Sequence, residues 1–234
     1  MSRTSLTTSA RNRVRSRAVR RTRSRVFRRA FAVLLAAVSV IAVMPSHEVV
    51  AQTKAIERDD YDDIFRKYSK RFFGPGFDWQ YFKAQAMAES NLRPDAKSRV
   101  GARGLMQLMP STYKEIKSAS SLQMKAINDP ESNIAAGILF DRDLYRRWKD
   151  HEVEPERMRF TFASYNAGPG TILRAKKTAR EEKLDEYRWK SMEIAAPRVQ
   201  RWRYKETLGY IATIESNYDQ LRKKPSKSSV VKHR

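Results

Sequence analysis

The sequence predicts an all-α protein. Apolar residues recur at spacings of three and four in one segment after another of the 234 residues, which is the period of an amphipathic helix. No segment shows a convincing alternation of apolar and polar residues, the pattern of a half-buried β-strand. Glycine and proline separate the periodic segments, so the pattern indicates several short helices joined by turns.

The first two helices carry clear start and stop signals. A helix is expected over residues 61–72 because its apolar residues share one face, and it ends before Gly74-Pro75-Gly76. Asp78 is a suitable N-cap for a second helix over residues 79–89. Residues 91–103 contain proline, glycine and mixed charge, which predicts a loop.

The later helices follow proline or capping signals. Thr112 opens a Thr-x-x-Glu pattern of capping-box form shortly after Pro110. Asp129 and Pro130 supply a cap and a first-turn proline. Residues 183–196 have no clear period and stay ambiguous. Helices are therefore predicted over residues 110–118, 130–148, 155–166, 171–182 and 203–221.

The N-terminus has the composition of an export signal. Residues 1–29 hold eleven arginines and no acidic residue, and an uncharged run of fifteen residues follows from Ala30 to Met44. Fifteen residues are fewer than the roughly twenty that span a bilayer, so a signal peptide cleaved before Gln52 is the preferred interpretation. The alternative is a basic arm that binds nucleic acid. Arg28-Arg29 leaves the general secretory and twin-arginine routes both open.

Cysteine and histidine usage limits the chemistry. The chain has no cysteine, which excludes disulfides, a thiol nucleophile and thiolate metal sites. Its three histidines, His47, His151 and His233, lie far apart in the sequence. We therefore expect neither a metal nor a cofactor.

Glu89 is the candidate general acid. On a helix it shares a face with Ala86, Gln85 and Phe82, so its carboxyl would lie against a largely apolar surface near the helix end. Burial penalises the charged form and raises the pKa, which lets a carboxylic acid keep its proton near neutral pH. A solvated or capping role is the alternative for a single glutamate at this position.

Four ordered motifs strengthen the catalytic interpretation. The motifs are Glu89-Ser90, residues 101–112 (GARGLMQLMPST), residues 164–168 (SYNAG) and residues 206–211 (ETLGYI). Together they resemble the catalytic domains of soluble and membrane-bound murein lytic transglycosylases, relatives of goose-type lysozymes in glycoside hydrolase family 23. The resemblance spans about residues 61–222 and implies one lysozyme-like helical domain. Ser164 and Ile211 replace the alanine and valine that are usual in the family, and both changes are small.

The resemblance implies a domain plan and a set of partners. Residues 1–51 would be a basic arm plus signal peptide, 52–60 a linker, 61–222 the catalytic domain and 223–234 a basic disordered tail. The protein would be exported to the periplasm or cell envelope and act on peptidoglycan glycan strands, not on nucleic acid. Cell-wall and secretion-machinery proteins are further candidate partners.

The resemblance also implies a mechanism with a single carboxylate. Glu89 would protonate the glycosidic oxygen between N-acetylmuramic acid and N-acetylglucosamine. The resulting carboxylate would then remove the proton from the muramyl C6 hydroxyl as that oxygen attacks C1, leaving a 1,6-anhydromuramyl end without consuming water.

Seven further positions acquire expected roles from the family motifs. Ser90 and Gln107 would contact substrate sugars, Gly104 would permit close backbone approach, and Met106 would form an apolar wall for the sugar. Tyr210 would hydrogen-bond the catalytic glutamate. The substrate-binding set is therefore Ser90, Gly104, Met106, Gln107, Tyr165, Asn166 and Tyr210.

Two other functions fit the same fold. A goose-type muramidase would use water as the attacking group and would need a second carboxylate, for which Asp95 is the nearest candidate in the sequence. A non-catalytic peptidoglycan-binding scaffold would keep the groove without the chemistry.

Overall fold

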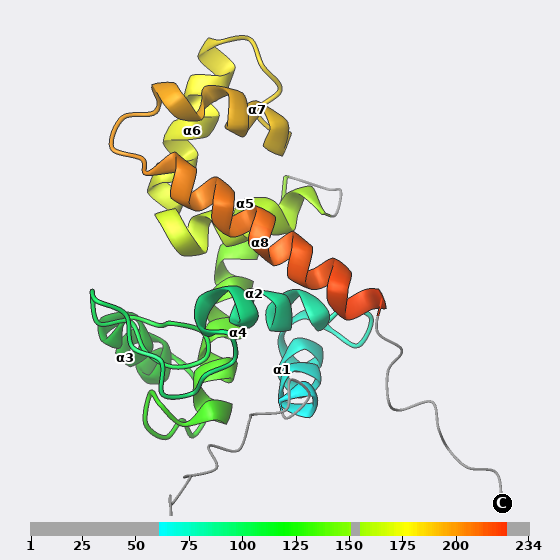
Figure 1. The fold of residues 1–234 in the computed structure, drawn as a ribbon, viewed down its shortest axis with the longest axis vertical. Helices are drawn as coiled ribbons and strands as arrows, with labels where there is room; N and C mark the ends of the chain where they lie inside the picture. The colour runs from blue at the N-terminus through cyan, green and yellow to red at the C-terminus, as the bar shows by residue number, and fades with distance from the viewer. Residues whose placement is uncertain (1–60, 151–154, 224–234) are drawn as a thin grey trace, which may run out of the picture. The chain divides into compact units, whose positions relative to one another are not determined.

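The computed structural model describes residues 61–150 and 155–223, and this part of the chain is helical (Figure 1). It contains no β-strand, only isolated bridges that join Arg103 to Lys97 and to Leu108. The all-α prediction is confirmed. The helices are α1 Asp62–Phe73, α2 Gln80–Ser90, α3 Pro110–Ala119, α4 Pro130–Arg147, α5 Glu156–Ala167, α6 Pro169–Glu181, α7 Trp189–Ala195, the 3-10 helix η1 Ala196–Arg198 and α8 Tyr204–Lys223.

Several sequence predictions lie outside the described residues. These are the basic arm and signal peptide over 1–51, the linker over 52–60, and the C-terminal tail apart from Lys223, which ends α8. Within the described ranges, no group of three histidine, cysteine, aspartate or glutamate side chains is placed to hold a metal ion. No helix of those same ranges is both long and apolar enough to cross a bilayer.

The predicted cap of α4 is confirmed, whereas the N-cap residue of α2 is Trp79, one residue after the predicted Asp78. The Asp78 carboxylate accepts a hydrogen bond from the backbone N–H of Gln80 at 3.0 Å, which satisfies one free donor at the start of α2. Asp129 accepts from the backbone N–H of Ser132 at 3.0 Å, and Pro130 occupies the first turn of α4.

Three sequence interpretations need correction. Thr112 does not cap a helix, because α3 already begins at Pro110, whose fixed φ suits a first helical position. For the same reason α6 begins at Pro169 instead of residue 171. The ambiguous segment contains α7, whose seven residues are too few to hold a helix alone. Its Trp189 is buried and meets the ring of Phe160 edge-on at 5.6 Å, so tertiary packing stabilises it.

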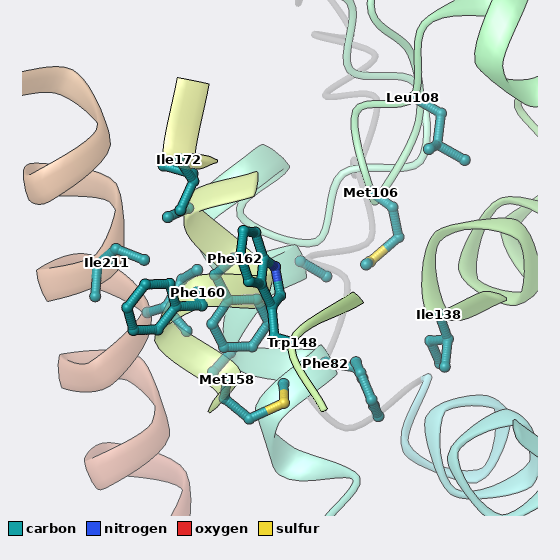
Figure 2. Packing of buried hydrophobic residues seen from close by; sticks show 14 of the residues in the cluster. Phe82, Met106, Leu108, Ile138, Trp148, Met158, Phe160, Phe162, Ile172 and Ile211 are labelled. Carbon is teal, nitrogen blue, oxygen red and sulfur yellow. The ribbon is translucent and has the colours of Figure 1, made fainter. Parts of the chain in front are cut away.

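Helix α2 lies inside the domain. All six residues from Phe82 to Met87 are buried, and α2 packs against both α1 and α8 (Figure 1). Figure 2 shows Phe82 near Ile138 of α4 in the surrounding core. Because apolar contacts cover α2 on several sides, its two ends are held in fixed positions relative to the neighbouring helices.

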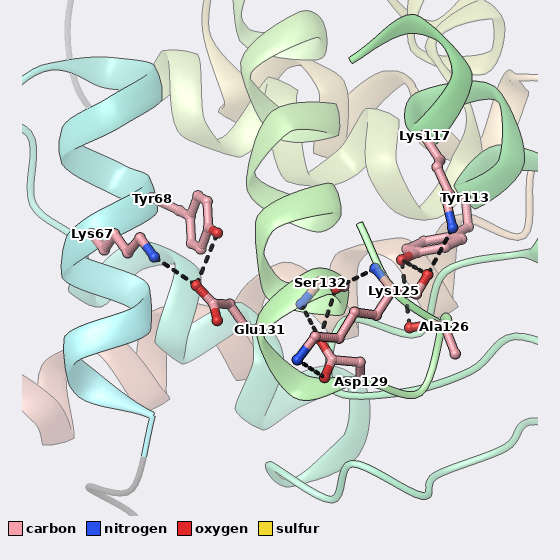
Figure 3. A network of polar contacts seen from close by, with 9 residues as sticks. All are labelled: Lys67, Tyr68, Tyr113, Lys117, Lys125, Ala126, Asp129, Glu131 and Ser132. Atoms are coloured by element: carbon pink, nitrogen blue, oxygen red, sulfur yellow. Dashed lines mark hydrogen bonds and ion pairs between the residues drawn. The ribbon is translucent and has the colours of Figure 1, made fainter. Parts of the chain in front are cut away.

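Polar contacts fix the start of α4 against α1 and α3 (Figure 3). Glu131 accepts from Lys67 at 2.6 Å and from the Tyr68 hydroxyl at 3.0 Å, both on α1. On the other side, the Ser132 hydroxyl accepts from the backbone N–H of Lys125 at 2.9 Å. The Tyr113 hydroxyl of α3 donates to the Lys125 carbonyl at 3.1 Å. These contacts set the position of the first turn of α4 relative to α1 and α3.

Gly137 on α4 marks a point of close packing. A Cβ atom there would lie 2.6 Å from Cγ and 2.8 Å from Cβ of Met106, atoms too close to the backbone of Met106 to swing away. In α8, a Cβ at Gly209 would meet nothing within 4 Å.

These two glycines give a matched pair of substitutions. Glycine to alanine in a helix interior gains about 0.5–1 kcal/mol, whereas overpacking a core costs about 1–3 kcal/mol. Gly209→Ala should therefore raise the free energy of unfolding, and Gly137→Ala should lower it by about 1–2 kcal/mol in urea denaturation. Equal stabilisation by both changes would contradict the packing described at Gly137.

Candidate active site

Glu89 lies in the last turn of α2. The helix ends one residue later, and Asn91 takes the left-handed conformation with φ 52°, donating its backbone N–H to the Met87 carbonyl at 2.9 Å. The predicted helix end is thus correct to within one residue. The Glu89 side chain is mostly covered by protein but keeps a partly exposed surface.

Tyr210 of α8 holds the Glu89 carboxyl. Its hydroxyl donates to Glu89 Oε1 at 2.6 Å, as expected from the sequence. Burial raises the pKa of Glu89 to about 7, and the Tyr210 hydrogen bond, which favours the charged form, offsets part of that rise. Burial and the nearby Glu89 raise the pKa of Tyr210 well above its ordinary value, so this hydroxyl keeps its proton. The carboxyl can therefore both hold and release a proton near neutral pH.

Gly104, in the loop after α2, packs directly against α4. Its φ is +77°, and a Cβ there would lie 2.4 Å from Nδ2 of Asn133 on α4. Both ends of the Asn133 side-chain amide are hydrogen-bonded. Its Nδ2 donates to the Arg103 carbonyl at 3.1 Å, and its Oδ1 accepts from the Met106 N–H at 2.7 Å. Only glycine fits this position, and the group it packs against is the Asn133 side chain of the protein itself.

Ser90 and Tyr165 bind two consecutive carbonyls of the same loop. The Ser90 hydroxyl is buried and lies 2.8 Å from the Leu105 carbonyl. The Tyr165 hydroxyl of α5 donates to the Met106 carbonyl at 2.7 Å. The sequence predicted sugar contacts for Ser90, whereas the structure shows its hydroxyl engaged with the backbone. Both side chains therefore fix the loop beside Glu89.

Met106 differs from its predicted role. We expected an apolar wall for a sugar, but the side chain is fully buried as part of the hydrophobic cluster in Figure 2, and it packs against Gly137 of α4. Close packing between the loop and α4 draws it into the core. Gln107, with φ 45°, is only partly buried, and its side-chain amide donates to the Gly104 carbonyl at 2.9 Å and to the Ala96 carbonyl at 3.2 Å.

Asn166 lies at a different place from the Glu89 cluster. It is exposed, and its Oδ1 accepts from the Thr207 hydroxyl of α8 at 2.8 Å. Thr207 in turn accepts from the indole N–H of Trp202 at 3.0 Å. These residues and Glu206 border a cavity of about 210 Å³ between the start of α6 and the start of α8. Asn166 is thus placed to contact a ligand in this cavity, whose lining does not include Glu89.

One buried residue near Glu89 was missed by the sequence analysis. Asp141 of α4 is fully buried and accepts from the Gln85 amide of α2 at 3.3 Å. The available signal was spacing, because Asp141 falls on the same helical face as Ile134 and Ile138. Asp95, the second carboxylate considered from the sequence, is exposed.

Comparisons with known proteins identify the family. The family model of the transglycosylase SLT domain matches residues 65–188, just over half of the chain. The chain belongs to this family.

Curated relatives include membrane-bound lytic murein transglycosylase F of Shewanella pealeana, 30% identical over 71% of this chain. The protein of the same name from Desulfosudis oleivorans is 31% identical over 73%. The chain spans only 38% and 42% of these relatives.

Solved structures with the same fold include the 70 kDa soluble lytic transglycosylase SLT70 of Escherichia coli. It is 27% identical, with a TM-score of 0.53 over 70% of this chain and 24% of that one. The lytic transglycosylase Slt of Pseudomonas aeruginosa has a TM-score of 0.56 at 23% identity, over 72% of this chain and 25% of that one. Each of these structural similarities covers only part of a much longer protein.

The contact between Tyr210 and Glu89 predicts a shift in pH dependence. Tyr210→Phe removes a hydrogen bond that favours the carboxylate, so the pKa of Glu89 should rise above about 7, by about one unit. A general acid is active while protonated, and the falling limb of kcat/KM against pH should move to higher pH. Tyr187→Phe, at an exposed position of the same residue type, serves as the control. A falling limb that stays in place or moves to lower pH would contradict the assignment.

Proposed function

We propose that this protein is a peptidoglycan lytic transglycosylase in which Glu89 is the single general acid and base. The observation that carries the proposal is the buried Glu89 carboxyl, whose pKa is about 7, held at 2.6 Å by the Tyr210 hydroxyl. Its membership of the SLT family and the names of its relatives supply the substrate class.

In the first step, Glu89 donates its proton to the glycosidic oxygen that leaves from muramyl C1. A carboxyl with a pKa near 7 is still protonated in a large fraction of molecules at neutral pH, yet is acidic enough to transfer the proton. As negative charge develops on Glu89, the Tyr210 hydrogen bond becomes stronger. Tyr210 thereby stabilises the state that the proton transfer produces.

In the second step, the Glu89 carboxylate accepts the proton of the muramyl C6 hydroxyl while that oxygen bonds to C1. The attack is intramolecular, so the rate depends on how well the sugar is oriented. Glu89 regains its proton and the site returns to its starting state. One carboxyl suffices because the proton given in the first step is recovered in the second.

A hydrolytic muramidase is the weaker alternative. It needs a second carboxylate that activates water at some distance from the first. Asp95 is exposed, and Asp141 is fully buried, where burial and the nearby Glu89 raise its pKa well above the ordinary value. The fully buried Asp141 therefore does not suit a base that activates water, which leaves the exposed loop residue Asp95 as the carboxylate that this alternative would need.

The predicted sugar-binding residues divide into two groups in this proposal. Gln107, Tyr165 and Asn166 keep accessible surface and would contact sugars or their acetamido groups. Ser90, Gly104 and Met106 would shape the loop behind them, since all three are buried. Tyr210 acts on the catalytic carboxyl.

We further propose that residues 1–51 direct export and that residues 61–222 are the catalytic domain. Envelope location fits relatives that are named membrane-bound murein enzymes, and the predicted signal peptide supplies a route. Murein carries acidic groups, and residues 52–234 keep a formal charge of +12 once the +10 of residues 1–51 is subtracted from the total of +22, so this charge would favour encounter with murein.

Mass spectrometry of muropeptides released from purified sacculi tests the proposal. The wild-type protein should release products one water lighter than reducing-end muropeptides, and Glu89→Gln should lower the rate by at least about a hundredfold. Glu115→Gln, on the exposed side of α3, is the matched control and should keep full activity. Reducing-end products would favour the muramidase, and binding to sacculi without any products would favour the scaffold.

A further inference from the structure

Two polar side chains lie buried behind Glu89. Gln85 of α2 and Asp141 of α4 each have no exposed surface, and the Gln85 Nε2 donates to Asp141 Oδ1 at 3.3 Å. Gln85 precedes Glu89 by four residues, so the two share one face of α2. This hydrogen bond therefore joins the last turns of α2 to α4 next to the candidate catalytic carboxyl.

The same pair contains two buried acceptors without a partner. Gln85 Oε1 and Asp141 Oδ2 are fully covered, and neither has a hydrogen-bond partner within the described part of the chain. In that part of the chain, the only other buried side-chain nitrogen or oxygen without a hydrogen-bond partner is Arg103 Nε. A buried oxygen without a hydrogen-bond partner is unfavourable because it loses its contact with water, so two on one pair of neighbouring side chains require an explanation.

One proton on Asp141 satisfies both acceptors. An amide and a carboxylic acid can form a ring of two hydrogen bonds, in which the amide N–H donates to one carboxyl oxygen and the acid O–H donates to the amide oxygen. The first bond is present, and the two unpaired oxygens are the atoms that the second would join. Turning the Gln85 amide over would place two oxygens together, an arrangement that also requires a proton.

The surroundings of Asp141 favour the neutral acid as well. The titratable groups that interact with it are Glu89 on α2, Tyr165 on α5 and Tyr210 on α8, all neutral or anionic. No lysine or arginine of the described ranges forms an ion pair with it, whereas the buried Lys83 is paired with Asp62. Burial, and then the charge of Glu89, raise the pKa of Asp141 well above its ordinary value.

We propose that Asp141 is a positioning residue that works as a neutral carboxylic acid, closing a two-bond ring with Gln85 that fixes the turn of α2 carrying Glu89. Its effect on catalysis rests on the function proposed above for Glu89. Its protonation state does not, because that follows from the two unpaired oxygens.

The neutral acid has a consequence for the chemistry of Glu89. An ionised Asp141 would add a second negative charge in a buried site and oppose ionisation of Glu89, which the base step requires. Kept neutral, Asp141 leaves Glu89 as the only group of this cluster that titrates near neutral pH. The buried pair thereby holds α2 in place without adding a negative charge next to Glu89.

Carbon-13 NMR of the protein labelled at the aspartate carboxyls shows directly whether Asp141 is protonated. The Asp141 resonance is the one that disappears in Asp141→Asn. It should keep the chemical shift of a neutral acid at neutral pH, where an aspartate in a model peptide is a carboxylate. A carboxylate shift at about pH 7 would overturn the proposal.

Two substitutions test the positioning role. Asparagine offers an N–H where the acid has its O–H, so Asp141→Asn should keep kcat within about threefold and the pH profile unshifted. Leucine has similar size but no hydrogen bonds, and Asp141→Leu should lower kcat by about tenfold or more with KM little changed. If Asp141 were ionised, Asp141→Asn would instead move the falling limb to lower pH.

The two proposals fail in different ways. A wild-type protein that does not cleave sacculi while its Asp141 resonance shows a neutral acid would refute the function and keep the buried pair. A cleaving enzyme with an Asp141 carboxylate would refute the pair and keep the function. Should Asp141→Leu fail to fold, the resonance and the pH profile of Asp141→Asn still decide.

Discussion

The burial of one carboxyl group at the end of α2 is the constraint on which the site depends. A half-exposed glutamate would be ionised at neutral pH, whereas burial brings the pKa of Glu89 to about 7. Because a raised carboxyl pKa means that the folded state binds its proton more tightly, this burial lowers stability as pH rises from about 4.5 to about 7. The buried α2 and its contacts with α1 and α8 provide the stability that offsets this cost.

The loop beside Glu89 is fixed from three directions. Ser90 holds the Leu105 carbonyl, Tyr165 holds the Met106 carbonyl, and Asn133 holds the Met106 N–H. These side chains come from α2, α5 and α4, so elements far apart in the sequence determine one short stretch of backbone. Backbone groups held in this way need no reorganisation during a reaction, and that is the physical meaning of a preorganised site.

Much of the fold was predictable because its signals are local. Apolar spacing and capping residues gave seven of the helices, with α4 starting at Pro130 as predicted. Helix α7 was not predictable, because contacts such as that of Trp189 with Phe160 stabilise it. At the site, periodicity alone indicated the burial of Glu89, and the family resemblance indicated its bond with Tyr210. Helical spacing could have indicated the burial of Asp141, but its pairing with Gln85 and the packing of Met106 against Gly137 are contacts between distant segments that no local pattern records.

The central claim is that one carboxyl carries a proton to the leaving oxygen and recovers it from the substrate, without water. Cleavage of purified sacculi in water enriched in oxygen-18 tests this most directly. The account predicts that the muramyl products contain no oxygen-18, since the new bond at C1 is made by the sugar's own C6 oxygen. One oxygen-18 atom at C1 of each new muramyl end would show that water is the attacking group and would contradict the account.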